Sequence, residues 1–559
     1  MRRLSIVARA GLLASFVLAA PTLLACLDHP LKPVEYELTS ETVDTIQLTV
    51  NKDVDILFVI DNSGSMGEEQ ARVAENFPAF ISVLEEKGVE ANYRIGVTTT
   101  DNGNPWCGTT TPEAGKLQMS SCRARTGEFV FNGNPPKDAT AEACTDLCKF
   151  DEITTLPTST DEDPDEKPRP WLESIEGKTN LAEVDGVTPT TTEAFQCFGP
   201  QGIAGCGFES HLESMYKALL RAQKEDEAQY GFLRDDAILA LVILSDEVDA
   251  SYNNAYQSIW LPESMGGNTV FWSDPTASQP TSAVQWRAGV ECTGGPGTYD
   301  ECHAQNYDVD GNPDVSDSKA VFHPVDRYTE FVQELEDMKQ AITPDQEVLV
   351  AEIVGVPAGY DRGMADIVYA DATDPAEQLD FGIGAGCTNA STTPPSTARP
   401  PVREREFAEA FQVGTEDSDR NLYSICEDDF SPALEAIADR IRSQLKPACM
   451  PSCVADSDPI ANGVQPTCTL QQATPKDGGG GAITSNIQPC NADESLPGDE
   501  DVCYVTLVGD DLSDECEMAG WNLEFRLVRR EGVPAAGGTT VSATCQLSQN
   551  KPIDCPGLP

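Results

Sequence analysis

The sequence predicts an α/β protein whose core is a doubly wound, mostly parallel sheet. Three nearly unbroken apolar runs, at 54–60, 237–244 and 348–356, are rich in Val, Ile, Leu and Ala. Runs of this kind are typical of parallel strands that are buried on both faces. Segments with the period of an amphipathic helix lie between and after them. Strands that alternate with helices favour a parallel sheet with right-handed crossovers.

Four helical segments are expected along this core. In the first, apolar residues from Phe77 to Leu84 line one face, and Pro78 is expected to kink or split the helix. In the second, the apolar residues between Leu212 and Leu220 recur at helical spacing. The other two helices are expected over 328–338 and 431–445.

Long polar insertions are expected to interrupt the core at about 101–200, 250–322 and 357–400. These segments are rich in Cys, Pro, Gly, Thr and acidic residues, and they show no helical or strand period over a useful length. We therefore expect loops held by disulfides, within one α/β domain that spans residues 52–446.

The last part of the chain, residues 447–559, is predicted to form a separate Cys-rich β module. Eight cysteines lie in the last 111 residues. The segment from Trp521 to Leu527 alternates apolar and polar side chains, which is the pattern of a half-buried strand. The expected result is a small β domain stapled by disulfides.

The N-terminus has the layout of a bacterial secretory signal. Residues 1–25 carry three arginines, no acidic residue and an apolar stretch that is too short to span a bilayer. The end of this segment, together with Cys26, resembles the lipobox of bacterial lipoproteins. The resemblance implies a lipid anchor on Cys26; an ordinary signal peptide followed by a coincidental cysteine is the alternative. Residues 26–51 are expected to form a polar tether.

The number of cysteines fits a lipid-anchored protein outside the cytoplasm. The chain has 19 cysteines, so modification of Cys26 leaves an even number that can pair completely in an oxidising compartment. Leu27 lacks the Asp that retains some lipoproteins at the inner membrane, so analogy favours the outer membrane or the cell surface. Connectivity cannot be deduced from sequence. The pairs considered are Cys292–Cys302, Cys144–Cys148 and Cys197–Cys206.

The charge of the chain restricts its partners. There are 37 Lys and Arg residues against 92 Asp and Glu residues, which gives a net charge of −55. A field of this sign repels phosphate backbones, so nucleic acid is not an expected partner. The surplus of acid favours cations, and simple solubility is the alternative interpretation.

The segment that carries chemistry is Asp61 to Ser65 (DNSGS), directly after the first predicted strand. Open α/β sheets bind ligands outside the carboxyl ends of their strands, and Gly64 permits a tight turn there. One carboxylate and two hydroxyls are hard donors suited to Mg²⁺, Mn²⁺ or Ca²⁺. Helix capping by these side chains is the alternative, but it does not account for Asp246 at the end of a second buried strand.

The stretch from Asp55 to Met66 (DILFVIDNSGSM) resembles the von Willebrand factor A (vWA) domain with its metal-ion-dependent adhesion site (MIDAS). The resemblance implies a Rossmann-like sheet and a bound divalent cation (Mg²⁺, Ca²⁺ or Mn²⁺) with one coordination position open to a partner's carboxylate. A threonine of the family's site is absent, and its place falls on Ser210, with Glu209 as the alternative ligand. The implied metal ligands are Asp61, Ser63, Ser65, Ser210 or Glu209, and Asp246.

These features predict a lipoprotein of the bacterial cell envelope that binds a protein or surface polymer through the cation. A structural envelope scaffold, in which the metal only stabilises the fold, is the alternative. The four histidines are scattered, with no H-E-x-x-H pair and no G-x-S-x-G motif, so no enzyme is expected. His211, next to the proposed metal loop, is expected to be an exposed helix residue. A disulfide at Cys206 is expected to fix that loop.

Overall fold

The computed structural model describes residues 43–48, 52–86, 89–133, 136–342, 346–414, 419–445, 448–458, 464–475, 482–530, 533 and 539–558. The predicted signal peptide, Cys26 and the predicted tether up to residue 42 lie outside the described residues. Within the described ranges, no helix is both long and apolar enough to cross a membrane.

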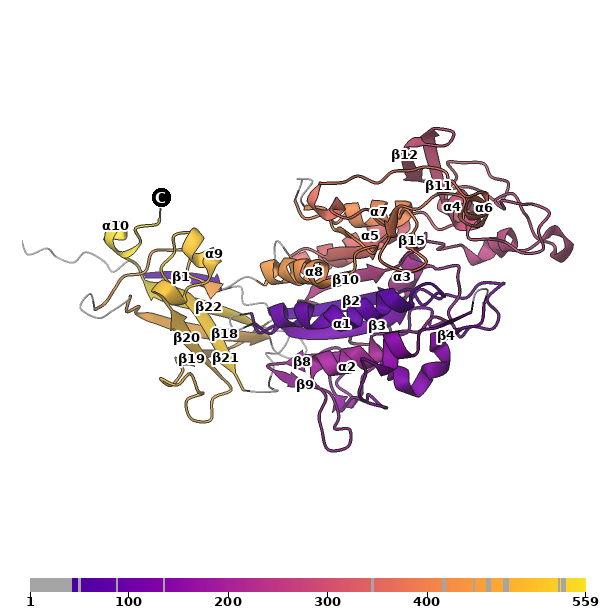
Figure 1. The fold of residues 1–559 in the computed structure, drawn as a ribbon. Coiled ribbons are helices and arrows are strands. Elements are labelled where there is room, and N and C mark those ends of the chain that lie inside the picture. Colours follow the sequence, from indigo (N-terminus) through magenta and orange to yellow (C-terminus); the bar gives the residue numbers. More distant parts are fainter. Residues whose placement is uncertain are drawn as a thin grey trace, which may run out of the picture. The chain divides into compact units, whose positions relative to one another are not determined.

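A seven-stranded sheet forms the core of the α/β domain (Figure 1). Five neighbouring strands are parallel, and the two strands at one edge run antiparallel. The prediction of an α/β fold with a mostly parallel sheet is therefore confirmed. Across the sheet, the strands are β16 (Leu422–Ser424), β13 (Leu349–Val354), β10 (Ile238–Leu244), β2 (Asp53–Ile60), β3 (Asn92–Thr99), β8 (Leu172–Ile175) and β9 (Lys178–Thr179).

The strand order reverses between β2 and β10. The chain first moves outward from β2 through β3 to β8, and the later strands β10, β13 and β16 are added on the other side of β2. In open α/β sheets, ligands bind outside the carboxyl ends of the strands at such a switch point. The residues that follow Ile60 and Leu244 therefore stand where a binding site is expected.

Helices cover both faces of the sheet. Phe58 of β2 faces one core, where the rings of Phe77 and Phe195 stack with centroids 3.7 Å apart. The next residue along the strand, Leu57, faces the other core, as strand alternation requires. The first core takes helices α1 (Gly67–Leu84), α2 (Thr191–Phe198) and α8 (Ser431–Gln444), and the second takes α3 (His211–Ala222), α5 (Asp326–Gln340) and α7 (Val402–Glu409). Helix α1 runs continuously across Pro78, so the proline does not split it.

The segment at 101–200 is less of an insertion than the sequence predicts. It supplies β8 and β9 to the sheet and α2 to the helical layer. The prediction was wrong for these elements because β8 has only four residues, and an edge strand of that length shows no usable period.

The other insertions contain short elements. Segment 250–322 builds its own core, in which Trp260, Trp272 and Phe322 are buried. The short elements of the α/β domain are η1 (Cys122–Phe129), β4 (Val130–Phe131), β5 (Lys137–Asp138), η2 (Ala141–Thr145), β6 (Pro157–Thr158), β7 (Lys167–Pro168), η3 (Asn254–Trp260), η4 (Glu263–Met265), α4 (Ala283–Gly289), β11 (Val290–Gly294), β12 (Tyr299–Ala304), η5 (Asp317–Lys319), η6 (Tyr360–Arg362), α6 (Pro375–Phe381), β14 (Cys387–Asn389) and β15 (Ser396–Ala398).

A second seven-stranded sheet is built mainly from the C-terminal part of the chain, with the order β1-β22-β18-β19-β20-β21-β17. Its core includes Leu470, Phe525 and Ala543. Its elements are β17 (Ala448–Cys449), β18 (Cys468–Pro475), β19 (Ala482–Pro489), β20 (Val502–Leu507), η8 (Gly509–Asp511), α9 (Asp514–Met518), β21 (Glu524–Arg529), β22 (Thr540–Gln546) and α10 (Lys551–Asp554).

The edge strand of this second sheet comes from the N-terminal side of the chain. Strand β1 (Val43–Leu48) pairs antiparallel with β22 over six residues. The prediction of a tether that continues to residue 51 was therefore wrong for 43–48. The segment VDTIQL has the β-branched, alternating character of a strand, but it is short and follows a polar stretch.

Nine disulfides pair all 18 cysteines of the described residues. The chain has 19 cysteines, and the remaining one is Cys26, which lies outside the described residues. The pair Cys292–Cys302 is confirmed, but Cys144–Cys148 and Cys197–Cys206 were wrong, because sequence proximity does not set connectivity. The bonds are Cys107–Cys206, Cys122–Cys144, Cys148–Cys197, Cys292–Cys302, Cys387–Cys426, Cys449–Cys516, Cys453–Cys555, Cys468–Cys545 and Cys490–Cys503.

Truncation of a central strand residue tests this core. Leu57→Ala removes a fully buried side chain from β2, and we expect it to lower the free energy of unfolding by about 2–5 kcal/mol. The matched change Leu156→Ala, at a side chain 46% exposed, should change it by less than about 0.5 kcal/mol. Urea unfolding followed by circular dichroism measures both, and equal effects would contradict the assignment of β2 to the core.

Candidate metal site

Two carboxylates are brought to the switch point by neighbouring strands. Asp61 follows β2, and its backbone N–H donates to the carbonyl of Leu244, the last residue of β10, at 2.9 Å. Asp246 lies two residues beyond Leu244. The pairing of β2 with β10 therefore places the ends of the two strands, and these two carboxylates, in the same region.

The DNSGS segment folds into a compact hydrogen-bonded turn. The backbone N–H of Ser63 donates to Asp61 Oδ1 at 2.7 Å, and the hydroxyls of Ser63 and Ser65 lie 3.1 Å apart. Ser65 Oγ in turn donates to Asp246 Oδ1 at 3.0 Å. The structure thus connects four of the residues singled out in the sequence, Asp61, Ser63, Ser65 and Asp246, in one set of oxygen atoms.

The set is open to solvent on one side. Asp61 and Ser63 are buried and Asp246 is 8% exposed, whereas Ser65 is exposed. At the same rim, Lys137 Nζ donates to the carbonyl of Ser65 at 2.8 Å. A ligand can therefore reach the set from the side of Ser65.

The loop before α3 presents Glu209 and Ser210 in different ways. Ser210 Oγ donates its proton to the carbonyl of Ala250 at 2.9 Å and keeps its lone pairs. Glu209 is fully buried, and its Oε1 has no hydrogen-bond partner, while Oε2 has only a long contact of 3.4 Å with Gln285 Nε2. Of the two alternatives, Glu209 is the one that brings a charge and a carboxylate oxygen without a hydrogen-bond partner among the described residues.

Two contacts hold this loop against the DNSGS turn. The disulfide Cys107–Cys206 ties it to the segment after β3, which confirms the expectation of a disulfide at Cys206. The backbone N–H of Gly205 donates to the carbonyl of Asn62 at 2.8 Å. A Cβ at Gly205 would lie 2.2 Å from Asn62 Oδ1, so any larger residue would require the buried side chain of Asn62 to move.

The negative charges of the carboxyl groups at the switch point repel one another. Burial raises the pKa of Glu209 and of Asp246 well above the ordinary value, and the charges of Asp61 and Glu247 raise both further. Burial also raises the pKa of Asp61, although the charge of His211 and the hydroxyl of Ser245 act in the opposite direction. Like charges in a desolvated site need protons or a cation to compensate them.

Carboxylates alone do not complete a metal site here. In the part of the chain that the structure describes, no three His, Cys, Asp or Glu side chains converge closely enough to hold a metal ion. A cation at this position would therefore use the serine hydroxyls, with water in the remaining positions, as hard cations commonly do.

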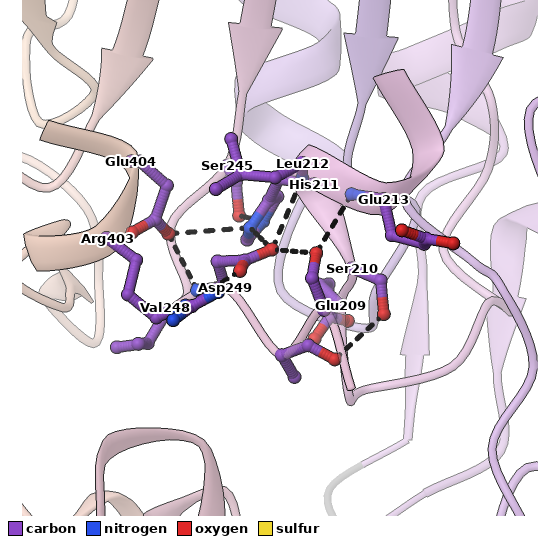
Figure 2. A network of polar contacts seen from close by, with 12 residues as sticks. Glu209, Ser210, His211, Leu212, Glu213, Ser245, Val248, Asp249, Arg403 and Glu404 are labelled. Atoms are coloured by element: carbon purple, nitrogen blue, oxygen red, sulfur yellow. Dashed lines mark hydrogen bonds and ion pairs between the residues drawn. The ribbon is translucent and has the colours of Figure 1, made fainter. Parts of the chain in front are cut away.

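Two residues that were not predicted as part of the site are linked to it: Ser245 contacts Asp61, and His211 contacts Ser245. Ser245 Oγ donates to Asp61 Oδ2 at 2.6 Å, and His211 Nε2 lies 2.6 Å from Ser245 Oγ (Figure 2). The expectation that His211 is exposed was wrong, since it is fully buried. Its helical spacing to Met215 and Leu219, both on the apolar face of α3, is the signal that could have placed it inside.

A Ser–His pair at this spacing also occurs in hydrolases, but this pair is not accessible. Both side chains are fully buried, and the hydroxyl of Ser245 is bonded to Asp61. A nucleophile must reach the reacting carbon of its substrate. The pair therefore contacts only other groups of the protein and is not positioned to attack a substrate.

Helix α7 closes the network behind His211 (Figure 2). Glu404 Oε1 accepts a hydrogen bond from the backbone N–H of Asp249 at 2.7 Å, and Arg403 Nε donates to Asp249 Oδ2 at 3.0 Å. Glu404 Oε1 also lies 3.4 Å from His211 Nδ1. Burial raises the pKa of Glu404 to about 7, although the charge of His211 lowers it.

Comparison with known proteins gives little further guidance. No protein-family model matches the chain. No curated protein matches it either. Among solved structures, it is similar to the pilus adhesin SpaC from Lactobacillus rhamnosus GG, at 9% identity and a TM-score of 0.25 over 89% of this chain and 40% of SpaC. It is also similar to the pilus adhesin RrgA from Streptococcus pneumoniae, at 10% identity and a TM-score of 0.23 over 90% of this chain and 58% of RrgA.

The chain thus spans less than two thirds of the length of either adhesin. SpaC in its open conformation gives a similar result, with 8% identity and a TM-score of 0.26 over 89% of this chain and 39% of SpaC. TM-scores of this size do not establish a shared fold.

The raised pKa of Glu404 predicts how stability depends on pH. Between about pH 4.5 and pH 7 the folded protein holds a proton on Glu404 that the unfolded chain releases, so stability falls as the pH rises through this window. We expect Glu404→Gln to lessen this loss by about 1–3 kcal/mol. Urea unfolding at pH 5, 6 and 7 in the presence of EDTA measures it, and a wild-type slope in the variant would contradict the assignment.

Proposed function

We propose that this chain is a vWA-type binding protein that holds a divalent cation at the switch point of its sheet and uses it to bind an acidic group. The observation that carries the proposal is the unpartnered Oε1 of the fully buried Glu209, whose pKa is raised by its burial and further by the charges of Asp61, Glu247 and Asp246. A buried acceptor without a donor, surrounded by like charge, is costly unless a cation compensates it.

In this proposal the cation is held by oxygen atoms from three segments. Ser63 and Ser65 supply hydroxyls from the DNSGS turn, Asp61 and Asp246 supply carboxylates from the ends of β2 and β10, and Glu209 takes the place expected for Ser210. The hydroxyl of Ser210, which donates to the carbonyl of Ala250, is neutral and is therefore the weaker candidate. Hard oxygen donors suit Mg²⁺, Mn²⁺ and Ca²⁺, and several carboxylates favour Ca²⁺.

The partner is proposed to be a protein or surface polymer that offers a carboxylate. The side of the site at Ser65 is exposed, so a coordination position there is within reach of a group from another molecule. The hydrogen bond from Lys137 Nζ to the carbonyl of Ser65 places a positive charge at the same rim. A carboxylate would be attracted by both the cation and this ammonium group.

A place in the cell envelope fits the cysteine pattern. Nine disulfides indicate an oxidising compartment, and Cys26 is the cysteine that they leave over. We propose that Cys26 carries the lipid anchor, with the folded body at the outer membrane or cell surface.

A structural scaffold is the second candidate, and the burial of the site favours it. Asp61 and Glu209 are fully buried, as expected of the ligands of a cation that only stabilises the fold. Capture of a surface partner in the presence and absence of EDTA separates the two functions. A partner retained in EDTA supports the scaffold, and a partner released by EDTA supports cation-mediated binding.

Calorimetry tests the cation site directly. Titration of the full-length chain with Ca²⁺, Mg²⁺ and Mn²⁺ should show binding of at least one ion. We expect the double change Asp61→Asn and Asp246→Asn to weaken this binding by at least about 100-fold, because both variants keep the side-chain volume and remove the charge. Unchanged binding would contradict the proposed site.

Glu209 and Ser210 provide a matched comparison in the same titration. Glu209→Gln should weaken cation binding by about 10- to 100-fold, and Ser210→Ala should leave it within about twofold of the wild type. The reverse order would assign the ligand to Ser210.

Membrane association tests the anchor. Cys26→Ala removes the proposed site of acylation, so the protein should move from the membrane fraction to the soluble fraction, since buried acyl chains contribute about 0.8 kcal/mol per CH₂ group. Fractionation of cells followed by immunoblotting measures the distribution. Persistent membrane association of the variant would indicate another anchor.

A further inference from the structure

Two buried side chains outside the proposed ligand set determine how Asp61 is held. Asp61, Ser245 and His211 are all 0% exposed, so water does not compete for their hydrogen bonds. Ser245 follows β10 directly, and His211 is the first residue of α3. A residue after β10 and a residue of α3 therefore contact each other (Figure 2), and Ser245 contacts the carboxylate of Asp61.

The direction of the hydrogen bonds follows from counting protons. A serine hydroxyl has one proton to donate. Ser245 donates it to Asp61 Oδ2 at 2.6 Å, because an ionised carboxylate can only accept. Ser245 Oγ must then accept from His211, so Nε2 of His211 carries a proton. Asp61 Oδ1 accepts from the backbone N–H of Ser63, and both carboxylate oxygens are thus fixed.

Two carboxylates lie near Nδ1 of His211, which forms no hydrogen bond of its own within the described part of the chain. Its Nδ1 lies 3.4 Å from Glu404 Oε1 and 3.7 Å from Asp249 Oδ1. Asp249 is anchored by Arg403 of α7, and its Oδ1 also accepts from Ser251 Oγ at 2.6 Å. The charges of Glu404 and Asp249 therefore lie on one side of the imidazole, and its Nε2 proton faces Ser245 on the other.

We propose that Ser245 and His211 are positioning residues for the cation site: they hold the carboxylate of Asp61 in the orientation that binding requires. This inference rests on the proposed cation-binding function. A ligand that is already oriented loses less conformational freedom when the ion binds, and groups that orient metal ligands commonly change metal affinity by about 10- to 100-fold. The exposed side of the site does not depend on this pair.

The length of the side chain at position 211 provides the sharpest test. The amide nitrogen of glutamine can reach the place of Nε2, whereas that of asparagine reaches only the place of Nδ1. We therefore expect His211→Gln to bind Ca²⁺ nearly as the wild type does, and His211→Asn and Ser245→Ala to bind it about 10- to 100-fold more weakly. Ser121→Ala is the matched control, because Ser121 is also buried but its hydroxyl donates to the carbonyl of Phe150, outside this network.

The experiment uses the full-length chain with Ca²⁺ titrations and with Tb³⁺ as a luminescent probe. Tb³⁺ lifetimes in H₂O and D₂O count the waters on the bound ion, and this number should change in Ser245→Ala and His211→Asn but not in His211→Gln or Ser121→Ala. If Ser245 and His211 have a purely structural role, the variants should have a lower melting temperature in EDTA, and His211→Gln and His211→Asn should bind the ion equally. The melting temperature in EDTA thus shows whether weak binding by Ser245→Ala is only a loss of folding.

Two results would overturn the inference in distinguishable ways. If the wild type binds Ca²⁺ and the glutamine and asparagine variants bind it equally, the positioning role is wrong while the proposed cation site stands. If the wild type binds neither Ca²⁺ nor Tb³⁺, the proposed function is wrong, and the positioning role is wrong with it.

Discussion

Repulsion among buried carboxylates is the constraint on which the rest of this site depends. Asp61, Glu209 and Asp246 are gathered at one end of the sheet with almost no exposure to water. Burial raises the pKa of Glu209 and of Asp246, and the charge of Asp61 raises both further, because like charges repel more strongly where water is excluded. A fold keeps this arrangement only where protons or a cation compensate the negative charge. The burial that strengthens the repulsion would also strengthen the binding of the proposed cation.

The fold achieves this concentration of charge by ordinary means. Adjacent parallel strands end side by side, so β2 and β10 deliver Asp61 and Asp246 to the same rim. The third carboxylate arrives on a loop that Cys206 anchors covalently and that Gly205 allows to approach the turn closely. Each carboxylate therefore lies on a segment that is fixed independently of the ion, which is the condition for a preformed site.

The sequence was informative where burial is continuous and misleading where elements are short or polar. The runs of β2, β10 and β13 predicted the central sheet and, with it, the meeting of Asp61 and Asp246. Strand β8 was missed because four residues at an edge carry no period, and β1 because it pairs with a strand almost 500 positions later in the chain. His211 was predicted to be exposed because titratable residues usually lie at the surface. Its position in the helix, however, is on the apolar face. Ser245 could not be recognised because a serine shows no pattern of its own.

The pairing of β1 with β22 also has a mechanical meaning. If Cys26 is anchored, tension on the protein enters the described body at Val43 and passes along β1. The hydrogen bonds of an antiparallel pair lie across the strands, so a pull along β1 loads all six paired positions together in shear and does not open them one at a time. Because Cys545 of β22 is bonded to Cys468 of β18, that load spreads covalently into the neighbouring strand. With Cys26 anchored, β1 is the first described element along the chain to carry such a force.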